Sequence, residues 1–264
     1  MSYRNYDYVS LFNPEGKVEP FTNIEKTTQL GALSVALINE KTLEGIILAH
    51  KITTHLEPQK IGDDENLLES KISLEFPRKK IFKVGPKTLF SFSGITNDGL
   101  EIYNYLLNMC VNERVNKNRS IDAAKVFDDL CVEAGARLMV RNNRPFGCTT
   151  LLLNIVNNKE LSLDSSVDQT TSSSNNSINK RIQLVEFGVA GKVNLCYAVS
   201  IGNRSQSART ILEKYYNDNM SLQDMINLGI RSMKNAINDL TPDVVEIYAL
   251  NDKGIHEIDP KQYM

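Results

Sequence analysis

No apolar run in this 264-residue sequence approaches the roughly 20 residues that a membrane-spanning helix needs, so we expect no membrane association. A basic surplus is missing too, because 30 Lys and Arg side chains stand against 32 Asp and Glu. Nucleic-acid binders show such a surplus or a basic face, and we do not expect this class of protein. Residues 1–7 lack the apolar stretch of a secretory signal, which predicts a protein of the cytoplasm and nucleus.

Cysteine is scarce, and its four positions lie far apart: Cys110, Cys131, Cys148 and Cys196. They form no Cys-x-x-Cys pair and no Cys/His cluster with the spacing that holds zinc. We interpret them as reduced and mostly buried thiols. The sequence therefore predicts neither a metal site nor another cofactor.

Short apolar runs and amphipathic segments follow one another in groups of like kind. Strands are expected over residues 32–38, 45–51, 80–84, 88–94, 149–156, 182–187, 194–199 and 244–250, and helices over 22–30, 100–110, 123–134, 205–216 and 222–237. This grouping favours antiparallel sheets with helices layered outside them over an alternating βαβ fold.

One domain over residues 1–264 is the economical interpretation, because no break in composition divides the chain into two cores. Residues 1–20 form a polar, aromatic-rich arm. Two polar stretches, near 53–77 and 158–181, are interpreted as flexible insertions, since they hold too little apolar surface to order themselves.

Four segments resemble, in order, the motifs of proteasome alpha subunits. They are Tyr6–Val18 in the arm, Ser93–Asp98, Arg144–Gly147 and Ser200–Glu213. The last is the most specific and is similar to the subunit at the sixth position of the eukaryotic alpha ring. The similarity covers essentially the whole chain apart from the two insertions.

The resemblance implies an α+β fold, a four-layer αββα sandwich of the N-terminal nucleophile hydrolase type. It also implies assembly with other alpha subunits in a seven-membered ring, stacked on a ring of proteolytic beta subunits. A role in ubiquitin-dependent protein degradation follows from the same resemblance, with control of substrate entry and docking of the C-terminal tails of activators.

Catalysis in this fold needs a Thr, Ser or Cys whose own free amine acts as the base. The corresponding pair here is Gly31-Ala32, and Ala32 has neither a hydroxyl nor a thiol. His50 stands where beta subunits carry a supporting Asp, and Lys80 where they carry a Lys. We therefore expect a subunit that is not itself an enzyme.

Three groups of site residues follow from the resemblance. An activator-tail pocket is expected at Lys80, Gly16, Lys17 and Gly31, a gate arm at Tyr6, Asp7, Tyr8 and Pro14, and a subunit-specific helix at Arg204, Ser205, Gln206 and Arg209. Two of these groups also have a simpler interpretation. Lys80 could be a solvated lysine at the start of a strand, and residues 204–209 could be only a solvated helix start.

Two other functions stay open from the sequence. The first is a free-standing hydrolase of the same fold that uses Ser2 or Cys148 as its nucleophile. The second is a binding module whose Ser/Thr-rich segment, residues 165–179, docks partners when it is phosphorylated.

Overall fold

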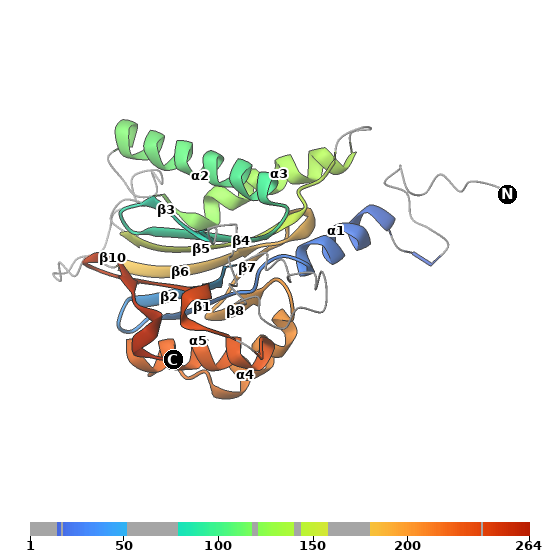
Figure 1. Cartoon of the computed structure of the whole chain (residues 1–264). Helices are drawn as coiled ribbons and strands as arrows, with labels where there is room; N and C mark the ends of the chain where they lie inside the picture. The colour runs from blue at the N-terminus through green and yellow to red at the C-terminus, as the bar shows by residue number, and fades with distance from the viewer. Residues whose placement is uncertain are drawn as a thin grey trace, which may run out of the picture.

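Two five-stranded antiparallel sheets lie face to face between two pairs of helices (Figure 1). The computed structural model describes residues 15–16, 18–51, 79–117, 121–139, 144–157, 180–238 and 240–264. The expected four-layer α+β sandwich is confirmed. Most of the predicted arm and of the two insertions lies outside the described residues.

The first sheet has the strand order β10-β9-β2-β1-β8. Its members are β1 (Ser34–Asn39), β2 (Glu44–His50), β8 (Ala198–Ile201), β9 (Val245–Asn251) and β10 (Gly254–Ile258). Its outer face is covered by α4 (Ser205–Tyr215) and α5 (Leu222–Ala236). Helix α5 begins at a capping box, in which Ser221 and Asp224 satisfy each other's backbone N–H groups.

The second sheet has the order β3-β4-β5-β6-β7. Its members are β3 (Ile81–Gly85), β4 (Thr88–Gly94), β5 (Cys148–Asn157), β6 (Lys180–Phe187) and β7 (Val193–Leu195). The helices α2 (Thr96–Lys117) and α3 (Ala123–Met139) cover it over a core rich in phenylalanine. Phe127 stacks on Phe187 there with ring centroids 5.2 Å apart.

Both faces of the central strands are buried, which explains their continuous apolar runs. In β1, Val35 and Leu37 face the helices, whereas Ala36 and Ile38 face the other sheet. Antiparallel strands usually alternate apolar and polar residues because one face meets water. Here neither face does.

Helix α1 (Glu19–Gln29) precedes the first strand and extends to one side of the sandwich (Figure 1). It begins three residues before the predicted start, and Pro20 in its first turn suits that place, since proline needs no N–H partner there. Three short 3-10 helices complete the described elements: Val189–Gly191, Pro242–Val244 and Pro260–Gln262.

One strand prediction was wrong, and one strand was missed. The single strand expected over 194–199 is two strands, β7 and β8, which belong to different sheets. The strand β10 was not predicted, because as a half-exposed edge strand it carries the polar pair His256-Glu257. None of the described helices is long and apolar enough to cross a membrane.

Candidate functional site

The chain enters the first strand through a backbone crossing at Gly31. A Cβ at Gly31 would collide with the backbone nitrogen of Gly94 and with Oγ of Ser93 at the end of β4. On the other side, the backbone N–H of Asn203 donates to the Gly31 carbonyl at 2.9 Å. Gly202 has φ +96°, and a Cβ there would collide with the Ala32 carbonyl oxygen. The segment before β1 is thus held between the ends of β4 and β8, and only glycine fits the closest approaches.

Ala32 lies inside this crossing with 3% of its surface exposed. Its neighbour Leu33 accepts a hydrogen bond of 2.9 Å from the backbone N–H of His50, so the segment that precedes β1 runs beside the end of β2. The imidazole of His50 is half-buried, and burial lowers its pKa, which favours the neutral ring.

Serine hydroxyls near Ala32 join the layers of the fold to one another. The Oγ atoms of Ser34 and Ser91 lie 3.1 Å apart and connect the two sheets. Ser93 Oγ donates to the carbonyl of Thr28 in α1 at 3.2 Å. Their geometry is that of structural hydrogen bonds between sheets and helix.

Lys80 lies directly before β3 and is only 9% exposed, so the interpretation of Lys80 as a solvated lysine is wrong. Its backbone N–H and that of Ile81 both donate to Oε2 of Glu246, at 3.0 and 3.2 Å. Its Nζ lies over the ring of Phe92, 5.5 Å from the centroid. The buried Glu246 carboxylate therefore fixes the backbone from which Lys80 extends.

Three of the four residues expected at the activator-tail pocket are described, and the pocket itself stays a prediction. Lys80 lies over the ring of Phe92, and Gly31 lies against Ser93 and Gly94. Both therefore lie near the C-terminal end of β4. Gly16 is exposed, with φ +75°, and nothing lies within 4 Å of a Cβ placed on it. Lys17 and the arm residues Tyr6, Asp7, Tyr8 and Pro14 lie outside the described residues.

Two sequence motifs meet in one ion pair at the start of α2. The guanidinium of Arg144 donates to both carboxylate oxygens of Asp98, at 2.6 and 2.7 Å. The backbone N–H of Gly147 donates to Oδ2 of Asp98 at 2.6 Å. Burial alone would raise the pKa of Asp98, but the hydrogen bonds from Arg144 and Gly147 outweigh it and lower the pKa. The carboxylate is held ionised at the helix N-terminus, where the helix dipole also favours it.

A family model described as proteasome subunit matches residues 63–166 and 177–250, more than half of the chain. The chain belongs to the proteasome subunit family.

Curated relatives of this proteasome-family chain are named alpha subunits, which confirms the predicted resemblance. Proteasome subunit alpha type-1 of Dictyostelium discoideum is 24% identical over 239 residues, covering 89% of this chain and 80% of the relative. Proteasome subunit alpha of Pyrococcus horikoshii is 22% identical over 242 residues, covering 90% and 76%. Proteasome subunit alpha type-6 of Saccharomyces cerevisiae is 24% identical over 176 residues, covering 64% and 66%.

The segment Ser200–Glu213, which resembles the sixth-position subunit, makes contacts within this chain through its two arginines. Arg204 has φ +54° and donates through its guanidinium to the Ala236 carbonyl at the end of α5, at 3.1 Å. Arg209 reaches the carbonyl of Ser200 at 3.4 Å and a carboxylate oxygen of Glu186 at 3.8 Å. Both arginines therefore position α4, a structural role that the sequence did not predict.

The backbone carbonyls at the start of α4 also accept side-chain hydrogen bonds. Ser205 accepts from Oγ of Ser200 at 2.8 Å, and Gln206 accepts from Oγ1 of Thr210 at 3.0 Å. The side chain of Gln206 is exposed. A contact of this helix with a neighbouring subunit stays a prediction.

Cys148, one nucleophile considered for an independent hydrolase, is unsuited to that chemistry in this proteasome-family fold. Its side chain is fully buried, and burial raises the pKa of the thiol to about 12. The thiolate is the reactive form, so at neutral pH almost none is present. Ser2 and the Ser/Thr-rich segment lie outside the described residues. Over the part of the chain that the structure describes, no group of three or more His, Cys, Asp or Glu side chains is placed to hold a metal ion.

Proposed function

We propose that this chain is a non-catalytic, structural subunit of the alpha ring of the 20S proteasome. The observation that carries the proposal is Ala32, buried in mid-chain at the place where the family's proteolytic subunits begin with their nucleophile. The reaction needs a side-chain hydroxyl or thiol and a free terminal amine on the same residue. Ala32 has no such side chain, and its nitrogen is an amide that follows α1.

The sixth ring position is proposed from the Ser200–Glu213 segment and from the similarity to the yeast subunit named type-6. Its partners would be the other alpha subunits, the beta ring and the C-terminal tails of activators. The particle would work in ubiquitin-dependent protein degradation in the cytoplasm and nucleus.

Activator docking is proposed to involve Lys80, with Gly16, Lys17 and Gly31 at the rim. A compact ammonium suits a terminal carboxylate. The two hydrogen bonds that Glu246 accepts from the backbone of Lys80 and Ile81 fix the main chain from which this cation extends, which supports a defined position for it. Control of substrate entry is proposed for the arm, residues 1–9, on the resemblance of Tyr6-Asp7 to the family signature.

The experiment is a peptidase assay on particles isolated through a tag on this chain, with and without a synthetic peptide that has an activator's C-terminal sequence. Lys80→Gln should abolish stimulation by the peptide. Lys79→Gln is the matched control, because it removes an adjacent but exposed charge, and it should leave stimulation unchanged. Equal stimulation in both variants would remove Lys80 from the docking site.

Gating is tested separately in the same particles. Deletion of residues 1–9 should raise hydrolysis of short peptides without the activator peptide. No increase would count against a gating contribution from this arm. If the tagged chain purifies without any peptidase subunit, the structural role itself is contradicted.

A further inference from the structure

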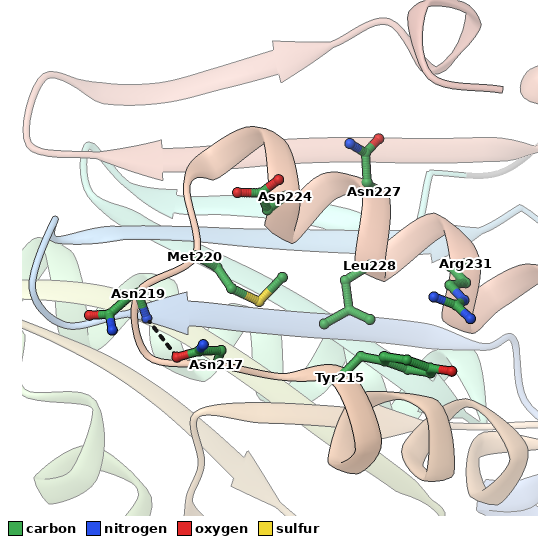
Figure 2. A pocket seen from close by; sticks show the side chains of 8 residues that line it. All are labelled: Tyr215, Asn217, Asn219, Met220, Asp224, Asn227, Leu228 and Arg231. Carbon is green, nitrogen blue, oxygen red and sulfur yellow. Dashed lines mark hydrogen bonds between the residues drawn. The ribbon is translucent and has the colours of Figure 1, made fainter.

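A surface hollow of about 420 Å³ lies between α4, α5 and the loop that joins them. Four of its lining residues, Asp224, Asn227, Leu228 and Arg231, follow at helical spacing and so lie on one face of α5. Figure 2 shows Met220 and Leu228 directed into the space between the loop and α5, with Tyr215 below Arg231. This site is carried by the outer pair of helices of the first sheet, whereas Lys80 and Gly31 flank the end of β4 in the second.

The two ends of the hollow differ in charge. At one end, Asp224 is committed to its capping box and accepts from the backbone N–H and Oγ of Ser221 at 3.2 and 2.7 Å. At the other, the guanidinium carbon of Arg231 lies 4.0 Å from the ring centroid of Tyr215. No carboxylate pairs with Arg231 among the residues that the structure describes.

Arg231 is well prepared to receive an anion. Stacking on Tyr215 holds the guanidinium plane in place, so little conformational freedom is lost when it binds. A second cation, Lys214, lies over the same ring with Nζ 5.3 Å from the centroid. Hydrogen bonding to Lys214 and the charge of Arg231 lower the pKa of the Tyr215 hydroxyl, which reports the positive potential at this end.

The dimensions of the hollow match a short extended peptide. Asp224 and Arg231 are seven residues apart on one helix, which corresponds to ~10 Å at ~1.5 Å per residue. An extended chain covers that length with about three residues, and its side chains i and i+2 point to the same side ~7 Å apart. One of them can therefore reach the apolar floor at Met220 and Leu228 while the other reaches Arg231.

We infer that this hollow binds an extended segment of a partner protein that carries an aliphatic side chain and, two residues further on, an acidic side chain. The aliphatic group lies against Met220 and Leu228, and the carboxylate pairs with Arg231 beside Tyr215. Asn227 also lines the hollow, between Asp224 and Arg231 in the sequence of α5. This binding site does not depend on the proposed role of the chain in the alpha ring or in gating.

The test compares two capped synthetic nonapeptides, Gly-Ser-Gly-Leu-Ser-Asp-Gly-Ser-Gly and the same peptide with Asn in place of Asp. Binding to the full-length chain, in the form in which it purifies, is measured by titration calorimetry or saturation-transfer NMR. We expect the Asp peptide to bind roughly tenfold more tightly, because a charge-assisted hydrogen bond to Arg231 is lost in the other. Capped ends ensure that the carboxylate comes from the side chain.

Three variants make the result specific. Arg231→Gln should remove the preference for the Asp peptide, and Arg231→Lys should retain part of it. Lys234→Gln is the matched control, since Lys234 is an exposed cation in the next turn of α5 that does not line the hollow. The inference is overturned if neither peptide binds at millimolar concentration, if the two bind equally, or if Lys234→Gln has the same effect as Arg231→Gln.

Discussion

Replacing Asp98 tests whether the ion pair at the start of α2 stabilises the fold as its geometry indicates. Asp98→Asn removes the charge but keeps one acceptor oxygen, which can still receive the N–H of Gly147. The two hydrogen bonds from Arg144 are lost or weakened. Asp98→Ala removes every acceptor and leaves the buried Gly147 N–H without its partner.

The magnitudes follow from the burial of each partner. A hydrogen bond to a charged group contributes about 1.5–3 kcal/mol, and the low end applies here because the Arg144 side chain is 61% exposed and remains hydrated. We expect Asp98→Asn to lower the free energy of unfolding by about 2 kcal/mol. The unpaired N–H adds about 1–3 kcal/mol, so Asp98→Ala should cost about 4 kcal/mol.

The dependence on pH has a definite sign. Because the pKa of Asp98 is lowered in the folded chain, its contribution is present above the usual aspartate pKa of 3.8 and is lost as the pH falls below that value. In the Asp98→Asn variant, the free energy of unfolding should lack this part of the pH dependence. Its stability and that of the unsubstituted chain should therefore converge in acid.

The assay is urea unfolding of the full chain followed by far-UV circular dichroism, since the sequence has no tryptophan to report by fluorescence. The reasoning is refuted if both variants unfold within about 0.5 kcal/mol of the unsubstituted chain, which is the usual range for surface changes. It is also refuted if Asn and Ala cost the same, because the Gly147 N–H would then contribute nothing.

Three further substitutions probe other contacts. Gly31→Ala places a Cβ against the backbone of Gly94 and against Ser93, so it should lower the free energy of unfolding by about 2 kcal/mol or more, measured by urea unfolding. Gly135→Ala is the control and should not destabilise the chain, because nothing lies within 4 Å of the new Cβ. Arg204→Gly and Arg204→Ala both lose the bond to the Ala236 carbonyl, but φ +54° suits glycine, so the glycine variant should be the more stable by about 1 kcal/mol. Hydrogen bonds from Lys180 and Lys87 lower the pKa of Asp252 to about 2. Asp252→Asn should therefore lower the free energy of unfolding by up to about 1 kcal/mol at neutral pH in low salt. This difference should disappear as the pH falls from 3.8 to about 2.

The layered fold was predictable because burial on both faces turns central strands into uninterrupted apolar runs. The same property made the prediction of a single strand over residues 194–199 wrong, because one apolar run crosses there from one sheet to the other. The backbone N–H of Cys196 donates to Leu184 in the second sheet, whereas the carbonyl of Tyr197 accepts from Ile38 in the first. Nothing in the local sequence marks this change of partner.

For the candidate functional site, the sequence predicts which residue types are present but not which of them lie in contact. The lack of a hydroxyl or thiol on Ala32 can be seen in the sequence, and so can the motifs that contain Asp98 and Arg144. Their bidentate contact joins residues 46 positions apart and depends on the tertiary fold. The close approach of Gly31 to β4 is likewise a property of the assembled backbone.

Native mass spectrometry of particles isolated through a C-terminal tag on this chain, with ejection of the tagged subunit, tests the central claim most directly. The account predicts that the chain leaves a large multi-subunit particle and that the bond between Gly31 and Ala32 is intact. A monomer, a small homo-oligomer, or an ejected chain that begins at Ala32 would contradict a structural, non-catalytic subunit.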